Sequence, residues 1–238
     1  MMRIVTWNCQ GAFRKKAEAV AQFKPDIAII QECECPERLA FPPHLPQPTT
    51  QMWFGERATQ GICVLSYNGL RFALGEAYDP AIRYCVPLRV SGPTADFHLL
   101  AVWAMPHTNP RLSYVGQIAQ AITRYGDFLT EKETVVAGDF NSNKQWDRKP
   151  RIGNHSWVVD ALARHGLVSV YHEWSGEAQG AESAKTLFMY RKRAKTYHID
   201  YCFAPRPWLK RLRFFAVGEY ERWSAASDHM PLFLEFSG

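Results

Sequence analysis

The sequence predicts one α/β domain with more than one layer of β-sheet. Short apolar segments of strand length and longer segments with helical spacing alternate throughout the 238 residues, and no obvious linker separates them. Hydrophobic residues make up 47% of the chain and charged residues 21%. These fractions are ordinary for a globular protein and exclude a disordered or fibrous chain. We therefore expect a single domain over residues 1–238.

The strands are predicted from short β-rich or apolar runs that end at polar residues, glycine or proline. These runs cover residues 3–7, 26–31, 51–54, 61–66, 83–90, 97–103, 134–137, 167–171, 198–203, 212–217 and 230–236. Between residues 51 and 103 the breaks are Gly and Pro turns, which favour antiparallel meanders. The proline-rich stretch 36–48 is predicted to be a loop, because proline removes a hydrogen-bond donor and restricts φ.

Three helices are predicted from the spacing of apolar residues. They cover residues 13–23, 113–129 and 156–165. We expect Ser113 and Ser156 to cap the second and third helices, because a serine hydroxyl can accept a hydrogen bond from a free N–H group of the first turn. Gly166 is expected to end the third helix.

The charge and the cysteines restrict the environment of the protein but not its activity. The formal net charge of +5 permits an anionic partner without proving one. No apolar run approaches the roughly 18 residues that cross a bilayer, and residues 1–10 do not resemble a secretory signal. We therefore expect a cytoplasmic protein, and we expect reduced, buried thiols at its six cysteines.

Polar side chains gather at the ends of the predicted strands. Three strands end in such residues and two begin with them, so antiparallel pairing would bring all five clusters to one sheet edge. The resulting pocket would contain Asn8, Glu32, Asp139, Asn141, His198, Asp200, Asp228 and His229. Four carboxylates crowd together only if a cation offsets their repulsion. Hard oxygen ligands favour Mg²⁺ or Mn²⁺ as that cation.

Six short motifs, in this order, resemble the endonuclease/exonuclease/phosphatase superfamily. They are Thr6-Trp7-Asn8, Gln31-Glu32, Gly61-Ile62-Cys63-Val64-Leu65-Ser66, Gly138-Asp139-Phe140-Asn141, His198-Ile199-Asp200-Tyr201 and Ser227-Asp228-His229-Met230-Pro231. The resemblance extends from residue 4 to about residue 236. It implies a four-layer α/β sandwich like that of deoxyribonuclease, in which two mixed β-sheets pack face to face and the helices lie outside.

The resemblance also implies a role for each matching residue. Glu32 would be the main ligand of the metal, with Asn8 beside it and Asp228 as a further ligand or supporting carboxylate. Asp139 would orient or deprotonate the attacking water, and Asn141 would help to hold that water or a phosphate oxygen. Asp200 and His229 would form a dyad, in which Asp200 fixes the imidazole tautomer and His229 contacts the phosphate or transfers a proton.

The chain departs from the superfamily pattern at several positions. Gln10 stands where some relatives carry Asp, and the dyad strand begins with His198 where relatives commonly have Arg. Many relatives present a His or Tyr to the phosphate before a proline, where this chain offers Trp103 or Ala104. His107 is near enough in sequence to substitute for that contact. Two roles stay open for His198, which would line the pocket or support Asp200. Asn143 would likewise reach the substrate or only form a turn.

Basic residues flank the motifs and could bind a phosphate polymer. They are Arg14, Lys15, Lys16, Lys144, Arg148, Lys149, Arg151, Arg191, Lys192, Arg193 and Lys195, with Trp146, Trp157 and Tyr190 available to stack on bases. The alternative is that these runs are only solvated loops. His155, His165 and His172 belong to no motif, and we expect them at the surface or at helix ends.

The sequence thus predicts a monomeric, divalent-metal-dependent phosphoesterase that hydrolyses phosphodiester bonds, most simply a nuclease acting on DNA. One alternative is a phosphodiesterase or phosphatase for a small substrate, such as a lipid head group, an inositol phosphate or a nucleotide. The other is a catalytically silent binding module, although the carboxylates and histidine of the motifs are all present.

Overall fold

A computed structural model describes residues 1–238 and contains two six-stranded β-sheets. The first sheet has the order β13 (Leu212–Val217), β14 (Leu232–Phe236), β1 (Met2–Asn8), β2 (Ile27–Cys33), β4 (Gln60–Ser66) and β3 (Thr50–Arg57). The second has the order β5 (Arg71–Leu74), β6 (Cys85–Gly92), β7 (Ala95–Trp103), β8 (Thr134–Asp139), β12 (Asp200–Pro205) and β9 (Leu167–Ser169). A short hairpin of β10 (Leu187–Phe188) and β11 (Thr196–Tyr197) stands apart from both.

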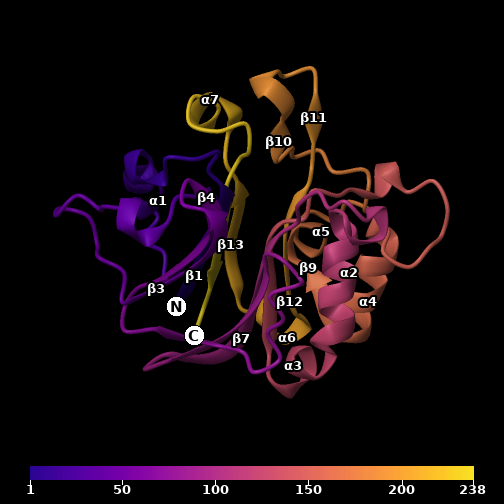
Figure 1. Cartoon of the computed structure of the whole chain (residues 1–238), viewed down its shortest axis with the longest axis horizontal. Helices are drawn as coiled ribbons and strands as arrows, with labels where there is room; N and C mark the ends of the chain where they lie inside the picture. The colour runs from indigo at the N-terminus through magenta and orange to yellow at the C-terminus, as the bar shows by residue number, and fades with distance from the viewer.

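Both sheets are mixed, and the pairing brings the predicted polar clusters to one end of the molecule. In the first sheet β1 is parallel to β2 and antiparallel to β14. In the second β8 is parallel to β7 and antiparallel to β12. The antiparallel arrangement expected for the last two motifs is therefore confirmed. In Figure 1 this end carries the β10–β11 hairpin, and both chain termini lie away from it.

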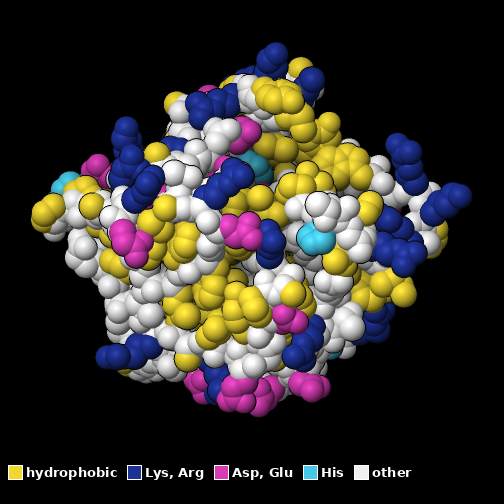
Figure 2. Space-filling view, in the orientation of Figure 1, with side chains coloured by type: hydrophobic (Ala, Val, Ile, Leu, Met, Phe, Trp, Pro, Cys, Tyr) yellow, Lys and Arg dark blue, Asp and Glu magenta, His cyan; other side chains and the backbone are white.

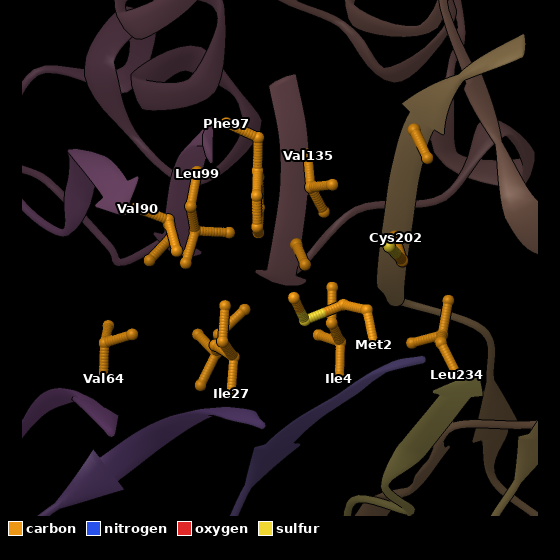
Figure 3. Close-up of a cluster of buried hydrophobic side chains, with 14 of the residues drawn as sticks. Met2, Ile4, Ile27, Val64, Val90, Phe97, Leu99, Val135, Cys202 and Leu234 are labelled. Atoms are coloured by element: carbon orange, nitrogen blue, oxygen red, sulfur yellow. The ribbon is translucent and has the colours of Figure 1, made fainter. Parts of the chain in front are cut away.

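The inner faces of the two sheets share one hydrophobic core. Met2, Ile4, Ile27, Val64 and Leu234 project from the first sheet, and Val90, Phe97, Leu99, Val135 and Cys202 project from the second (Figure 3). Burial of large apolar side chains stabilises this contact by roughly 1.5–3 kcal/mol for each fully buried residue. A core built from both sheets agrees with one domain over residues 1–238, which stays a prediction.

Helices cover the outer face of each sheet, so the fold has four layers (Figure 1). The second sheet packs against α2 (Val115–Arg124), α3 (Gly126–Glu131) and α4 (His155–Arg164). The first packs against α1 (Ala17–Ala21) and the Trp223 end of α7 (Tyr220–Trp223). The chain also forms α5 (Val170–Ser175) and α6 (Arg206–Leu209). The predicted α/β sandwich of deoxyribonuclease type is confirmed.

The predicted helices were less accurate than the strands. The helix expected over 113–129 is interrupted at Tyr125, and that over 13–23 is only a 3-10 turn followed by the five residues of α1. Ser113 does not cap α2, because its hydroxyl accepts a hydrogen bond from the His107 N–H. Ser156 does not cap α4 either, since Asn154 accepts the bond from Trp157 N–H. Apolar spacing alone does not reveal such breaks.

Two further strand predictions needed correction. The strand expected over 167–171 ends at Ser169, where α5 begins. The short edge strand β5 was not predicted, because three of its four residues are exposed and it lacks a clear apolar pattern.

The cysteines agree with the expectation of buried thiols. All six cysteines are free and buried. None of the helices combines the length and the apolar character that crossing a bilayer requires.

Candidate active site

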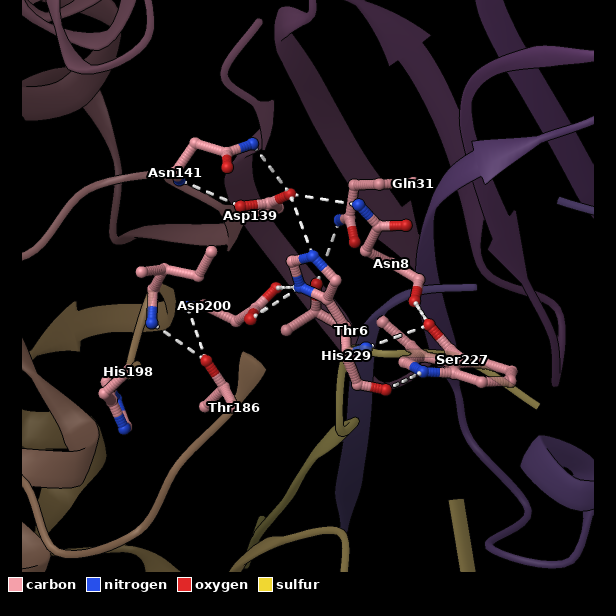
Figure 4. Close-up of polar contacts among 12 residues, drawn as sticks. Thr6, Asn8, Gln31, Asp139, Asn141, Thr186, His198, Asp200, Ser227 and His229 are labelled. Atoms are coloured by element: carbon pink, nitrogen blue, oxygen red, sulfur yellow. Dashed lines mark hydrogen bonds and ion pairs between the residues drawn. The ribbon is translucent and has the colours of Figure 1, made fainter. Parts of the chain in front are cut away.

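The candidate site lies where β1, β2 and β8 end and where β12 and β14 begin (Figure 4). Asn8 is the last residue of β1 and Asp139 the last of β8, and the two sheets bring these residues together. The amide nitrogen Nδ2 of Asn8 donates to Asp139 Oδ2 at 3.0 Å. The same nitrogen donates to Glu32 Oε1 at 3.1 Å. One amide therefore links both sheets and both carboxylates.

Asp139 is fully buried and is held by three further contacts. Its Oδ1 accepts a hydrogen bond from the Asn141 backbone N–H at 2.8 Å, and its Oδ2 accepts one from Asn141 Nδ2 at 3.0 Å. The imidazole Nε2 of His229 lies 4.0 Å from Asp139 Oδ2. Burial raises the pKa of Asp139 to about 7 against the opposing pull of His229, and the Asp200 carboxylate adds to the rise.

Asp200 and His229 form a hydrogen-bonded pair. His229 Nδ1 lies 3.0 and 3.2 Å from the two carboxylate oxygens of Asp200, and both side chains are buried. Burial by itself would lower the pKa of His229, but the Asp200 and Asp139 carboxylates outweigh it and raise the pKa to about 10. The imidazole therefore carries a proton at neutral pH, and its Nε2 can donate a hydrogen bond to an anion.

Backbone contacts hold His229 against β1. The Trp7 indole donates to the His229 carbonyl at 2.8 Å. The Ser227 hydroxyl donates to the Asn8 carbonyl at 2.8 Å and accepts from the His229 N–H at 3.0 Å. The sequence motifs contain Trp7 and Ser227, but nothing in the sequence assigned these contacts to them.

Glu32 lies in an irregular part of β2. Pairing of β2 with β4 shifts register between Ile30 and Cys33, and Glu32 has a left-handed φ of 57°. Such a backbone costs roughly 1–3 kcal/mol for a residue other than glycine and is concentrated at functional sites. The Glu32 side chain is half-buried, and its second carboxylate oxygen accepts no hydrogen bond within the protein. That oxygen is free to bind a ligand.

The donor atoms fit a hard divalent cation. Glu32 offers a free carboxylate oxygen, the Asn8 amide oxygen accepts only a backbone N–H, and Asp228 has a half-buried carboxylate that makes no hydrogen bond. Asp139, Asp200 and His229 also approach one another within 4.8 Å. Both Asp200 oxygens already face the His229 imidazole, so Glu32 and Asn8 offer the oxygen atoms that are less engaged by the protein.

His198 and Asn143, two further candidates from the sequence, make contacts within the protein. His198 is buried, and its Nδ1 contacts the Ala184 carbonyl at 2.8 Å. Burial lowers the pKa of His198 to about 4. The Asn143 amide donates to Glu182 Oε2 at 3.1 Å and to the His198 carbonyl at 2.9 Å. His198 Nε2 has no hydrogen-bond partner, but both side chains are buried, so we do not propose them as phosphate contacts.

The remaining candidates come from the end of β7 and from the loop after it. Trp103 pairs with Asp139 in the register of β7 and β8, but it is buried and stacks on Tyr84 with 5.0 Å between the ring centroids. His107 is half-buried in the following loop, where its Nδ1 accepts from the Asn109 N–H at 2.9 Å. Trp103 therefore flanks Asp139 as a packed wall of the site.

The sequence interpretation missed a buried polar network next to these residues. His155 is buried, and its Nε2 lies 3.0 Å from Gln179 Oε1. His172 Nε2 lies 3.2 Å from Glu182 Oε1. His155 begins α4, which agrees with the helix-end position expected for it, although its side chain is buried, and His172 is half-buried in α5. No local signal reveals the network, because its members come from separate segments of the chain.

Comparison with known proteins identifies the family of the chain. A sequence model of the Endonuclease/Exonuclease/phosphatase family matches residues 5–229. No curated protein matches the chain significantly.

Solved structures with the same fold include nucleases and a phosphatase. A 3′ phosphatase from Neisseria, bound to a product DNA hairpin, has a TM-score of 0.70 at 21% identity, and the match covers 100% of both chains. An AP endonuclease from Archaeoglobus fulgidus has a TM-score of 0.65 at 19% identity, also over 100% of both chains. An AP endonuclease from Leishmania major has a TM-score of 0.70 at 16% identity, over 100% of this chain and 88% of the other. With the family model matching nearly its whole length, the chain belongs to the endonuclease/exonuclease/phosphatase family of metal-dependent phosphoesterases.

Proposed function

We propose that this protein hydrolyses phosphodiester bonds in nucleic acid, most simply DNA, with the help of Mg²⁺ or Mn²⁺. The observation that carries the proposal is the meeting of the Asn8–Glu32 pair, the buried Asp139 and the Asp200–His229 pair at one end of the two sheets. Phosphodiester hydrolysis needs a positioned water, a group that binds the phosphate and compensation of its negative charge.

Each group has a distinct task in this proposal. Glu32, Asn8 and Asp228 would hold the metal, which would supply positive charge against the negative charge of the phosphate. Asp139 orients the attacking water and accepts its proton, which its pKa of about 7 makes possible near neutral pH. Asn141 keeps Asp139 in place and lies beside the water. Protonated His229, held by Asp200, donates its Nε2 hydrogen to a phosphate oxygen.

Two basic features near the site favour a polymeric substrate. Lys144, Arg148, Lys149 and Arg151 line one hollow of about 450 Å³, and none of them forms a salt bridge. Asp147 and the exposed Asp160 also line it, and the Asp147 carboxylate accepts from the first N–H groups of α4. Lys and Arg side chains gather at the right-hand edge of the molecule in Figure 2.

The β10–β11 hairpin supplies the second feature. Its tip carries the exposed Tyr190, Arg191 and Lys192. The Arg191 guanidinium donates to Gln10 Oε1 at 2.7 Å, two residues beyond Asn8, so the tip lies close to the metal ligands. An exposed aromatic ring among cations can stack on a base while the cations bind phosphates.

A substrate panel with added metals tests the proposal. It should contain abasic-site DNA, single-stranded DNA, RNA, sphingomyelin, inositol phosphates and bis-p-nitrophenyl phosphate. We expect hydrolysis of DNA with Mg²⁺ or Mn²⁺ and none with EDTA. Activity confined to a lipid or small phosphoester would instead identify a small-substrate enzyme. Metal binding without turnover of any substrate would identify a binding module.

Substitution of Glu32 tests the metal site directly. Glu32→Gln keeps the size of the side chain and removes its charge, so it should weaken Mg²⁺ binding in a calorimetric titration and lower activity at limiting metal. Glu37→Gln removes an exposed carboxylate nearby and should change neither quantity. Unaltered metal affinity in Glu32→Gln would contradict the assignment.

A further inference from the structure

The two members of the Asp200–His229 pair belong to different sheets. Asp200 begins β12 in the second sheet, and His229 precedes β14 in the first. Asp200 is fixed in its own sheet by pairing with Asp139, but His229 lies outside the ladder of β14 and no ladder joins β12 to β14. The 3.0 Å contact between His229 Nδ1 and Asp200 Oδ2 therefore depends on other contacts between the beginnings of β12 and β14.

Thr186 is bonded to both of these strand beginnings. Its side chain is completely buried, and its Oγ1 accepts from the Asp200 N–H at 3.0 Å and from the Ile199 N–H at 2.9 Å. Its backbone carbonyl accepts from the Met230 N–H at 2.7 Å. Figure 4 shows the Thr186 hydroxyl directed at the backbone that leads into Asp200.

The residues after Thr186 continue the contact with the His229 side. Leu187 forms an isolated antiparallel bridge with His229. The Phe188 N–H donates to the Asp228 carbonyl at 2.8 Å. The short segment 186–188 is thus hydrogen-bonded to residues 228–230 by its backbone and to residues 199–200 by one side chain.

We propose that Thr186 is a positioning residue that sets the distance between the Asp200 carboxylate and the His229 imidazole. The N–H groups of Ile199 and Asp200 both donate to the Thr186 hydroxyl. Removal of the hydroxyl would leave both buried N–H groups without this acceptor, which costs free energy. Relaxation of the β12 start toward another acceptor would move Asp200 relative to His229. Small displacements of supporting groups commonly cost activity, because catalytic geometry tolerates little error. The expected effect on kcat rests on the proposed function, whereas the expected effect on the Asp200–His229 distance does not.

The test compares Thr186→Val with Thr186→Ser. Valine keeps the shape and lacks the acceptor, whereas serine keeps the hydroxyl. We expect Thr186→Val to lower kcat by about 10- to 100-fold with little change in KM, by analogy with other supporting residues. Thr186→Ser should recover most of the loss. Thr134→Val is the matched control, because Thr134 is also a buried threonine and its hydroxyl donates only to the Lys132 carbonyl.

A readout without activity separates this proposal from the proposed function. The proton between His229 Nδ1 and Asp200 should give a slowly exchanging low-field NMR signal in the wild-type protein, Thr186→Ser and Thr134→Val. Thr186→Val should lose or shift that signal while the thermal unfolding transition stays cooperative. If Thr186→Val keeps the signal unchanged, or if Thr186→Ser is as impaired as Thr186→Val, the positioning role is overturned. If Thr186→Val does not fold, the test uses Thr186→Ser. A positioning role requires Thr186→Ser to keep both the NMR signal and kcat, and loss of either would overturn the role.

Discussion

At the scale of single residues, Glu32 and Glu34 show how one backbone angle sends two nearby carboxylates to different partners. Residues i and i+2 of a regular strand lie on the same face. The left-handed φ of Glu32 breaks this alternation. Glu32 contacts Asn8, whereas buried Glu34 accepts from the N–H groups of Phe13 and Arg14. Sequence spacing alone could not have separated the two roles.

The dyad leads to a prediction about paired substitutions. Asp200 acts through His229 in our proposal, so His229→Ala should already remove what Asp200 contributes. We expect each single variant, Asp200→Asn and His229→Ala, to lower kcat by about 10²- to 10⁴-fold. The double variant should be hardly worse than His229→Ala, because residues that act as one unit are not additive. Single-turnover kinetics measure this, and losses that multiply would refute the dyad.

Burial of His198 leads to a prediction about stability and pH. Its folded pKa of about 4 lies below the usual value of 6.5, so the unfolded chain binds the proton first as the pH falls. The stability that comes from keeping His198 neutral is therefore complete above about pH 6.5 and is lost between that pH and about pH 4. From pH 7 to pH 5, the free energy of unfolding should fall by about 2 kcal/mol more in the wild-type protein than in His198→Gln. Urea denaturation at both pH values measures the difference, and equal declines would contradict it.

At the scale of elements, the close approach of β7 and β8 shapes the strand that ends in Asp139. Gly138 has a φ of 148°, and a Cβ atom there would lie 1.8 Å from the Val102 carbonyl oxygen. Only glycine allows β8 to run this close to β7 just before Asp139. The glycine of the Gly-Asp-Phe-Asn motif is thus explained by packing between strands.

Substitution of Gly138 should therefore damage both stability and the site. We expect Gly138→Ala to lower the free energy of unfolding by about 1–3 kcal/mol or more, because the backbone oxygen cannot move aside without disturbing the ladder. Gly126→Ala is a suitable control, since its Cβ would meet only His165 at 3.7 Å. Chemical denaturation of both variants measures the effect, and equal stabilities would show that the strands can separate at little cost.

At the scale of the whole molecule, the basic hollow and the hairpin extend the surface around the site. If a nucleic acid strand lies across the hollow, its affinity should fall steeply with salt because bound counterions are released. The double variant Arg148→Ala, Lys149→Ala should make the slope of log K against log salt shallower by about 2. Binding of fluorescent DNA at several salt concentrations measures the slope.

Two cations elsewhere provide the control for this effect. Arg71 on β5 and Arg213 on β13 are exposed and form no salt bridge, so Arg71→Ala, Arg213→Ala lowers the net charge equally. This control should leave the slope nearly unchanged. A similar reduction of the slope in both double variants would mean that the overall charge, and not the hollow, attracts DNA.

The sequence by itself determined the family, the two-sheet fold and the set of polar residues that meet at the site. It did so because these residues sit at strand ends in a fixed order, and strand ends are visible as apolar runs that stop at a polar residue. The antiparallel direction of β12 and β14 could also be inferred, since only that direction unites the five polar clusters.

Only the tertiary structure decided which side chains share contacts across distant segments. It bonded Glu34 to the Phe13 backbone, engaged Asn143 and His198 in a buried network and placed Thr186 between the beginnings of β12 and β14. It also divided the helix after β7 at Tyr125. Hydrogen bonds of this kind join residues tens to hundreds of positions apart, and the local patterns of a single sequence contain no record of them.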